Sequence, residues 1–407
     1  MPRAALAGQS ATDAGQNAEA PRLSRAGARF AATGANIGTS EVRPFLPNAP
    51  AYDKFPFGLW QTCANRQARH SFRAGMGYAD PAGYAPLRRA IAEYLAMHRG
   101  DRCDPEQIVI TPGGHTAFMI ATLLLTDPGD GVLFEDPGPL IARKLFESLD
   151  RRIVSVPVDA DGMDFEHVLQ AVPPPRLVFA MPSRHHPLGR TLSLARRLRL
   201  MDWAQANAAW IIEDDYDSEF RYTGRPLPSM RSIDAPGRVL YVGTFSKALF
   251  PALRVGYFVL PPALVQVFRN AMALMFRSVP LETQMVLADF IAEGHFATHL
   301  RRMRDLYTQR RHDFIETAAE VSDGRFQIDS PDSGMNVITW LPEGVGERRI
   351  HAKAQTMGVH CYPLSDYCLQ PYPRSALILG FTCVQPHLLR PGLQTLAQVI
   401  ATEQRQV

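Results

Sequence analysis

The sequence predicts an α/β protein with a mostly parallel sheet that is covered by helices on both faces. Seven short apolar runs alternate with stretches of helical character, at residues 107–111, 131–135, 152–158, 176–182, 210–215, 238–243 and 254–261. Apolar runs of this length are typical of strands that are buried on both faces of a parallel sheet. The 407 residues are enough for two domains, each with a substantial core.

The segments between these runs carry helix signals. Leu87, Ile91 and Leu95 recur at helical spacing, which predicts one apolar face. Ser193 precedes another such segment, and serine is a favoured N-cap residue because its hydroxyl accepts a hydrogen bond from a free backbone N–H. From about residue 285 the pattern changes to a long arginine-rich helix, short strands and a final helix.

Composition and pattern divide the chain into three parts. Residues 1–42 are rich in Ala, Gly, Ser and Arg and have almost no large apolar side chains, so we expect this arm to be flexible. Residues 43–285 should form a large domain that includes an N-terminal segment. Residues 286–407 should form a smaller α+β domain.

One lysine, Lys247, lies between the apolar runs at 238–243 and 254–261. An ammonium group normally stays at the surface. Holding it in an apolar setting lowers its pKa and makes the amine a nucleophile, which suits it to form a Schiff base with a carbonyl cofactor. The alternative is a surface lysine on a connecting loop.

Acidic residues follow the apolar run that ends at Ile212, namely Glu213, Asp214 and Asp215, and Tyr216 comes next. In open α/β sheets the ligand binds beyond the carboxyl ends of the strands, so these side chains should point at the site. Pyridoxal phosphate needs a lysine for its aldehyde, an acid for its pyridine nitrogen and donors for its ring oxygen and phosphate. A solvated strand end is the alternative for the acids alone.

Four motifs carry a resemblance to a known family: EDDYDSEFRY, GRPLP, GTFSK and FPALRVGY. With them, the chain from about residue 22 to its C-terminus resembles the aminotransferase-like domain of the MocR branch of GntR-type regulators. The resemblance implies the fold type I architecture of pyridoxal-phosphate-dependent transferases, with a seven-stranded sheet. It also implies that residues 23–32 match the linker after the winged helix-turn-helix domain of these regulators, and we expect that domain to be absent here.

The resemblance implies a role for five residues around pyridoxal 5′-phosphate. Lys247 would form the Schiff base, Asp214 would pair with the pyridine nitrogen, and Tyr216 would hydrogen-bond the ring hydroxyl oxygen. Arg254 and Thr244 would bind the phosphate, for which a guanidinium fork is well suited.

The resemblance also implies contacts at the phosphate end. Tyr78 matches a tyrosine that in this fold reaches the phosphate of the neighbouring subunit, so the active site would require a homodimer. An apolar strand turns through Gly113 and Gly114 into a helix, and backbone amides at such a helix start bind anions. Relatives usually read SGAQ here, so Pro112, Gly114 and His115 are departures that would leave the amide contacts in place.

Other departures lie close to the expected cofactor ring. Pro139 stands where relatives commonly carry a tyrosine, and proline offers no face for aromatic stacking. Arg184, His185 and His186 replace the usual SHQ and aromatic pattern of the loop that borders the ring oxygen. His115, His185 or His186 could stack on the cofactor or act as a general acid or base, or they could be polar loop residues.

The substrate end is less distinctive. An α-carboxylate is best received by a bidentate arginine, which in this fold usually lies on a late strand. The matching segment, SALILGFTCVQPH, contains no arginine. Arg374, directly before it, is the nearest candidate for the carboxylate receptor.

Properties of the whole chain narrow the class of protein. A net charge of +3 gives no basic surface for nucleic acid, and no apolar run approaches the length of a membrane span. The five cysteines form no CxxC pair, which argues against a disulfide framework and against a structural zinc site. We therefore expect a cytoplasmic protein without a metal, a nucleic acid partner or a membrane partner.

Three functions agree with these residues. The first is an enzyme that uses pyridoxal phosphate on an amino acid or related amine, most simply by aminotransfer, with Lys247 moving the Cα proton. The second is an enzyme of the same cofactor with other chemistry, such as elimination, racemisation, decarboxylation or oxidation. Pro139, the loop at 184–186 and the missing strand arginine motivate it. The third is a non-catalytic module, derived from a regulator, that senses an effector.

Overall fold

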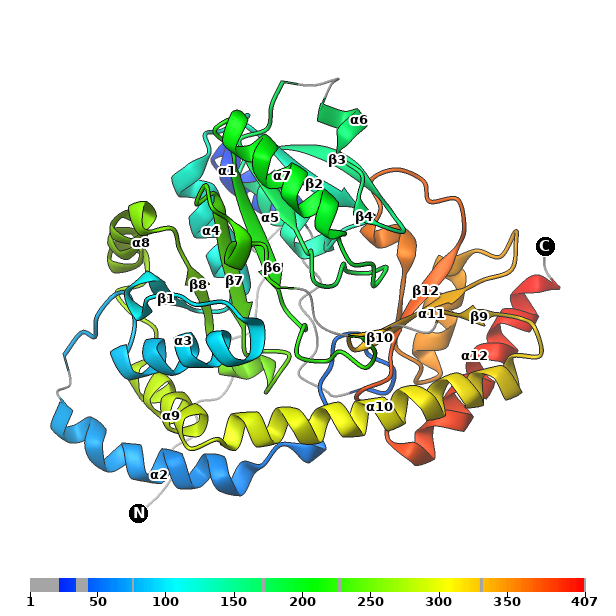
Figure 1. Ribbon diagram of the computed structural model, residues 1–407. Helices are drawn as coiled ribbons and strands as arrows, with labels where there is room; N and C mark the ends of the chain where they lie inside the picture. Colours follow the sequence, from blue (N-terminus) through cyan, green and yellow to red (C-terminus); the bar gives the residue numbers. More distant parts are fainter. Residues whose placement is uncertain are drawn as a thin grey trace, which may run out of the picture.

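An eight-stranded sheet forms the larger part of the molecule (Figure 1). The computed structural model describes residues 22–33, 43–74, 77–169, 173–224, 228–329 and 332–405. The strands are β1 (Ile108–Thr111), β2 (Gly131–Asp136), β3 (Arg152–Asp159), β4 (Gly162–Met163), β5 (Leu177–Ala180), β6 (Trp210–Asp215), β7 (Val239–Thr244) and β8 (Gly256–Val259). All seven predicted strands are present. The eighth, β4, was missed because two residues give no apolar run.

The strand directions bring six carboxyl ends to one edge of the sheet. In space the order is β1-β8-β7-β6-β5-β2-β3-β4. β2, β3, β5, β6 and β7 are parallel, whereas β8 runs antiparallel between β7 and β1. β1 therefore points in the same direction as β7. The carboxyl ends of β1, β2, β3, β5, β6 and β7 lie at one edge, where open α/β sheets bind their ligands.

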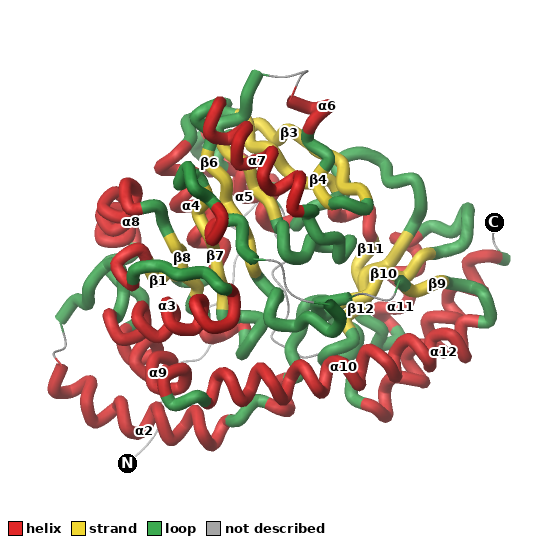
Figure 2. Tube along the Cα trace, in the orientation of Figure 1, coloured by secondary structure: helices red, strands yellow, loops and turns green. Residues whose placement is uncertain are grey.

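Successive residues of the central strands enter two separate cores, because side chains alternate between the faces of a strand. Phe134 and Phe179 belong to the core that includes residues of α4 and α5. Leu133 and Val178 belong to the second core, which includes residues of α7. Figure 2 shows helices on both sides of the strands, as predicted. The three helices are α4 (Gly114–Leu125), α5 (Leu140–Ser148) and α7 (Leu194–Ala206).

The predicted helix signals are confirmed. The side chains of Leu87, Ile91 and Leu95 form a buried face of α3, and the Ser193 hydroxyl caps α7 by accepting from the Arg196 N–H. None of the helices in the described ranges is long and apolar enough to cross a membrane. The other helices of this part are α2 (Phe57–Ala74), α3 (Ala85–Arg99), α6 (Glu166–Leu169), α8 (Pro262–Met275) and α9 (Leu281–Ala292).

A second, antiparallel sheet follows in the C-terminal part, in the order β11-β12-β10-β9. The predicted arginine-rich helix is α10, which packs against α9 and α12 and runs along one side of the molecule (Figure 1). The domain boundary at residue 285 stays a prediction. The elements are β9 (Gln327–Ile328), β10 (Asn336–Trp340), β11 (Cys361–Pro363), β12 (Ala376–Gly380), α10 (His295–Ser322), α11 (Glu347–Thr356) and α12 (Pro386–Gln404).

A short helix, α1 (Arg25–Ala32), lies within the arm that the sequence predicts to be flexible. Its Arg29 side chain pairs with Asp150 at 3.2 Å and donates to the Ser148 carbonyl at 3.3 Å, so the helix is docked at the end of α5. The sequence analysis did not predict this helix, and the flexibility of the arm stays a prediction. Composition missed the helix because it contains little apolar surface of its own. Residues 1–21 and 34–42 lie outside the described residues.

Candidate functional site

A cavity of about 540 Å³ opens beside the carboxyl ends of the strands. It brings together nine predicted site residues from six segments of the chain. They are Gly114, His115, Pro139, His186, Asp214, Tyr216, Thr244, Lys247 and Arg254.

Lys247 lies in the turn after β7 and is half-buried in the cavity wall. Its Nζ donates to the backbone carbonyl of Asn48 at 3.1 Å. Burial lowers the pKa of the amine, while the charges of Asp217 and Asp214 oppose that shift. The arrangement is that of a lysine with an increased fraction of uncharged, nucleophilic amine.

Only one acid of the cluster on β6 faces the cavity. Asp214 lines it, and burial raises the pKa of this carboxyl well above its usual value, with Asp215 and Asp217 adding to the effect. The Glu213 carboxylate instead accepts from two backbone N–H groups, at residues 230 and 231. The Asp215 carboxylate pairs with Arg99 at 2.7 Å. A cationic ring nitrogen beside Asp214 would therefore relieve its charge penalty.

Gly113 and Arg254 form a close contact at another end of the cavity. Gly113 has a φ of +90°, and an added Cβ would lie 3.2 Å from Cζ of Arg254. Nη2 of Arg254 donates to the Pro112 carbonyl at 2.7 Å. Gly114 begins α4, whose first N–H groups have no partner within the helix, and Thr244 ends β7. A guanidinium and a helix start are suited to a phosphate.

The two histidines of the loop after β5 have different surroundings. The Nε2 of His185 donates to the Pro137 carbonyl at 2.8 Å, and its Nδ1 accepts from the Leu188 N–H at 3.3 Å. Burial lowers the pKa of this imidazole to about 3. His185 does not line the cavity, so the structure does not support a cofactor role for it. His186 lines it, and its buried Nδ1 has no hydrogen-bond partner among the described residues. Burial keeps this imidazole neutral by lowering its pKa.

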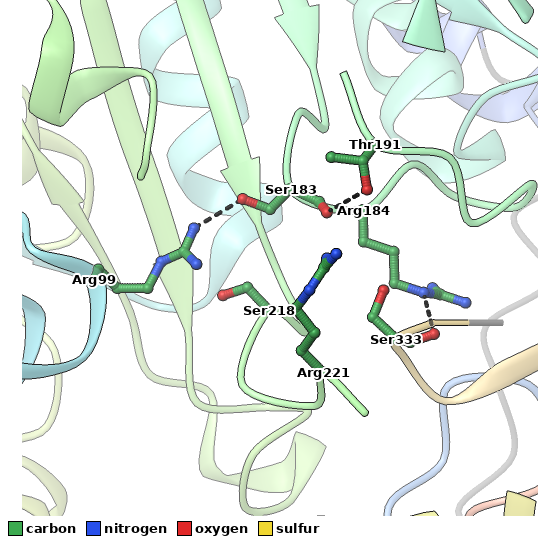
Figure 3. Close-up of a pocket in the computed structure, with 7 residues that line it drawn as sticks. All are labelled: Arg99, Ser183, Arg184, Thr191, Ser218, Arg221 and Ser333. Atoms are coloured by element: carbon green, nitrogen blue, oxygen red, sulfur yellow. Dashed lines mark hydrogen bonds between the residues drawn. The ribbon is translucent and has the colours of Figure 1, made fainter. Parts of the chain in front are cut away.

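Arg184, the first residue of this loop motif, is buried behind Tyr216. Its Nη1 donates to the Tyr216 hydroxyl at 2.6 Å and to Asp217 at 3.1 Å. Figure 3 shows the neighbouring small cavity, of about 10 Å³, with the Arg184 Nε donating to the Ser333 carbonyl. The volume suits one water molecule at most. The sequence pattern marked Arg184 as a departure but gave no signal of its partners.

Asn48 and Tyr367 line the cavity and Asn336 supports Asn48, and all three were missed from the sequence. Asn48 and Asn336 pair through their side chains at 2.6 Å, and the Asn48 N–H donates to the Asn336 amide oxygen at the same distance. Tyr367, which ends the 3-10 helix Leu364–Tyr367, lies edge-on to His186 with ring centroids 5.0 Å apart. None of the three lies in a motif, so no local signal could have found them.

The cavity extends beyond these groups to the C-terminal part. Its lining there includes Arg43, His351, His360, Tyr362 and Asp366. The His351 Nδ1 lies 2.7 Å from the carbonyl of residue 361, which fixes the ring against β11.

Two predicted residues lie outside the cavity of this chain. Arg374 donates to the Gln327 side chain at 3.0 Å and stacks over the Trp340 ring at 5.1 Å. The guanidinium therefore does not line the cavity in this structure, and the assignment of Arg374 as the receptor of the substrate carboxylate stays a prediction. Tyr78 is 84% exposed, with the Arg277 guanidinium over its ring, and it does not line the cavity.

One group of potential metal ligands occurs in the described residues, away from the cavity. It consists of Cys63, Glu293 and His295, whose ligand atoms lie within 4.8 Å of one another. The Arg66 guanidinium pairs with Glu293 and donates to the Cys63 sulfur at 3.7 Å. The Arg66 guanidinium therefore already supplies the positive charge at this group, and we assign no metal to it.

The donor set fits pyridoxal 5′-phosphate. The cavity offers an amine with a lowered pKa at Lys247, an acid that lacks a cation at Asp214 and an unpartnered ring nitrogen at His186. Opposite them lies the anion-binding start of α4 beside Arg254. These are the four kinds of group that the cofactor requires.

The fold and this site are those of a fold type I protein that uses pyridoxal phosphate. The chain belongs to the aminotransferase class I and II family, whose sequence model matches residues 48–371. It is similar to the probable rhizopine catabolism regulatory protein MocR of Rhizobium meliloti, with 38% identity over 379 residues, 93% of this chain and 76% of that protein.

Two enzymes are also similar to the chain. Aromatic-amino-acid aminotransferase 1 of Thermococcus litoralis is 26% identical over 376 residues, 91% of this chain and 90% of that enzyme. The solved structure of LysN, the α-aminoadipate aminotransferase of Thermus thermophilus complexed with N-(5′-phosphopyridoxyl)-L-leucine, has a TM-score of 0.82 and 26% identity. The match covers 90% of this chain and 94% of the LysN chain.

Replacing Gly113 with alanine should weaken binding of pyridoxal phosphate about tenfold, equivalent to about 1.4 kcal/mol. The new Cβ would lie 3.2 Å from Cζ of Arg254 and would displace the guanidinium. Titration of the cofactor-free protein, followed by visible absorption, measures this affinity. Gly129→Ala is the matched control, because Gly129 has a φ of +91° and open space around an added Cβ. An equal loss in both variants would show that backbone strain alone is responsible.

Proposed function

We propose that this protein is a pyridoxal-phosphate-dependent enzyme that acts on an amino acid or related amine, most simply by aminotransfer. The observation that carries the proposal is the presence of Lys247 and Asp214 in one cavity of about 540 Å³, each with its charged form disfavoured. When bound, pyridoxal phosphate supplies an aldehyde that condenses with amines and a ring that withdraws electrons from the substrate Cα.

Each side chain then has a defined task. The uncharged amine of Lys247 would bind the cofactor through its aldehyde, and the same amine would move the proton at the substrate Cα. Asp214 would pair with the ring nitrogen, and Tyr216 and His186 would donate to the ring oxygen. The start of α4, Thr244 and Arg254 would hold the phosphate.

A second candidate is an effector-sensing module that binds a ligand without turnover. It is favoured by the higher identity to the regulatory protein from Rhizobium meliloti, 38%, than to the aminotransferase from Thermococcus litoralis, 26%. The position of Arg374, outside the cavity, also favours it, because no arginine of β12 is available to receive a carboxylate.

We also propose that the protein acts as a homodimer with shared sites. Tyr78 is exposed and has no role within its own chain, yet its motif matches that of a tyrosine which reaches the phosphate of the neighbouring subunit. Its position beside Arg277 would present a hydroxyl and a guanidinium to a partner.

Incubating the cofactor-loaded protein with α-, β- and γ-amino acids tests the reaction. Aminotransfer predicts release of a keto acid or aldehyde and loss of the visible absorption band, restored by a second keto acid. Release of ammonia or carbon dioxide, or production of the opposite enantiomer, would replace aminotransfer by other chemistry of the same cofactor. A spectral change without any product would favour the sensing candidate.

Lys247→Ala should abolish the visible absorption that pyridoxal phosphate gives when it is linked covalently to the protein, because the other lysine that lines the cavity, Lys144, is held by the Thr33 carbonyl. Absorption spectroscopy, after loading with the cofactor and dialysis to remove the unbound excess, measures the loss. Lys353→Ala, on the outer side of α11, is the control and should keep the band. A band that persists in the Lys247 variant would contradict the proposed function.

Tyr78→Phe should weaken cofactor binding about two- to tenfold, the contribution of one hydrogen bond. The comparison is made by cofactor titration, with sedimentation to establish that the variant is still dimeric. Tyr372→Phe, which keeps a ring stacked on Trp340, serves as the control. Unchanged affinity in a dimeric Tyr78 variant would remove Tyr78 from the site.

A further inference from the structure

We propose that Arg184 is a positioning residue, which holds the hydroxyl of Tyr216 and strengthens its donation to the ring oxygen of the cofactor. The inference rests on the proposed function, since it concerns the same site. It assigns a role to the residue at which the loop after β5 departs from its relatives. Three independent features carry it: the contacts of the guanidinium, the slot that holds it and the chemistry of its partners.

The guanidinium of Arg184 joins three segments that are far apart in the sequence. Nη1 donates to the Tyr216 hydroxyl at 2.6 Å and to Asp217 at 3.1 Å, both directly after β6. Nε donates to the Ser333 carbonyl at 2.9 Å, and Nη2 lies 3.4 Å from the Asn336 carbonyl at the start of β10. Its side chain is only 2% exposed. A buried fork with four acceptors has one orientation, so it fixes the groups that it contacts.

The slot for this side chain depends on Gly334. The residue has a φ of +86°, and an added Cβ would lie 1.9 Å from Nε and 2.0 Å from Cζ of Arg184. The Gly334 N–H donates to the Phe220 carbonyl at 2.7 Å, and its carbonyl accepts from the Tyr222 hydroxyl at 2.5 Å. The backbone at 333–336 is therefore tied to the segment after β6, and the Arg184 guanidinium contacts both segments.

The chemistry of the two side chains determines which one donates and which one accepts in the hydrogen bond between Arg184 and Tyr216. A guanidinium has only donors, so the Tyr216 oxygen must accept from Arg184 and its own proton must go to another acceptor. The available acceptors are Asp217 and whatever occupies the cavity that Tyr216 lines. Hydrogen bonds in a chain polarise one another, so a phenol that accepts from a cation donates more strongly. Arg184 thus makes Tyr216 a better donor to an oxygen in the cavity.

The same residues connect to Lys247 from the other side. The Asn336 backbone lies against Arg184, and its side chain pairs with Asn48, whose carbonyl accepts from the lysine. Displacing the guanidinium would therefore disturb both the Tyr216 hydroxyl and the Asn48 carbonyl that holds the Lys247 amine. The ionisable groups around Tyr216 come from three segments: Asp214 on β6 and Asp217 after it, Arg184 and His186 after β5, and Lys247 after β7.

The test is the pH midpoint at which the visible band of the cofactor-loaded protein changes with protonation of the Lys247 nitrogen. Arg184→Gln should raise this midpoint by about half a unit or more. A weaker donor stabilises the negative ring oxygen less, so the nitrogen beside that oxygen keeps its proton to higher pH. Asp217 should become neutral in the variant, since burial raises its pKa to about 6 even beside Arg184. No unpaired charge is then left behind.

A double-mutant cycle with Tyr216→Phe separates positioning from general electrostatics. If Arg184 acts through the hydroxyl, Arg184→Gln should shift the midpoint in the wild-type background and leave it unchanged in the Tyr216→Phe background. Equal shifts in the two backgrounds, or no shift in either, would overturn the inference. A protein that binds no cofactor at all would instead overturn the proposed function, so the two failures are distinguishable.

Two further variants guard the interpretation. Arg151→Gln removes another buried guanidinium, which donates to Thr126 at 2.7 and 2.8 Å far from the cavity, and should lower stability without moving the midpoint. If Arg184→Gln does not fold, Arg184→Lys keeps a charge near Asp217 but cannot make the fork. The same cycle with Tyr216→Phe then applies, with the same criterion.

Discussion

The amine of Lys247, half-buried at the edge of the large sheet, is the group on which the rest of the site depends. Its Nζ is held by the Asn48 carbonyl, and Asn48 is held in turn by Asn336. The amine therefore takes this position only when the segment around Asn48, the turn after β7 and the start of β10 are packed together. Burial removes water from the ammonium group and so favours the uncharged amine, which is the nucleophilic form.

The acids beside it show how strand geometry distributes chemistry. Glu213, Asp214 and Asp215 are consecutive, yet alternation on β6 sends them to different surroundings. Glu213 accepts from backbone N–H groups, and Asp215 is neutralised by Arg99, so both stabilise the scaffold. Only Asp214 is left facing the cavity without a cation of its own, apart from the influence of Lys247. A cofactor with a basic ring nitrogen would complete it.

Arg184 and Arg374 illustrate opposite outcomes for two unusual arginines. Arg184 is a departure from the pattern of its relatives but lies directly behind the cavity, where it contacts Tyr216. Arg374 was the expected substrate receptor but is drawn to Trp340 and Gln327. The end of β12 is covered by the chain around Leu46, whose carbonyl would lie 2.1 Å from a Cβ at Gly380. The end of the cavity away from the strands is lined instead by residues of the C-terminal part and by Arg43.

The sequence by itself predicted seven of the eight strands of the large sheet and the residues at or directly after their carboxyl ends, including Asp214, Tyr216, Thr244 and Lys247. These are local features, because a side chain directly after a parallel strand reaches the ligand edge whatever packs around it. Only the tertiary structure decided that Asn48 supports the lysine and that Arg184 holds Tyr216. These contacts join residues 199 and 32 positions apart, and the Arg184 contact to Ser333 joins residues 149 positions apart. Such pairings depend on how the two sheets pack, which no local pattern encodes.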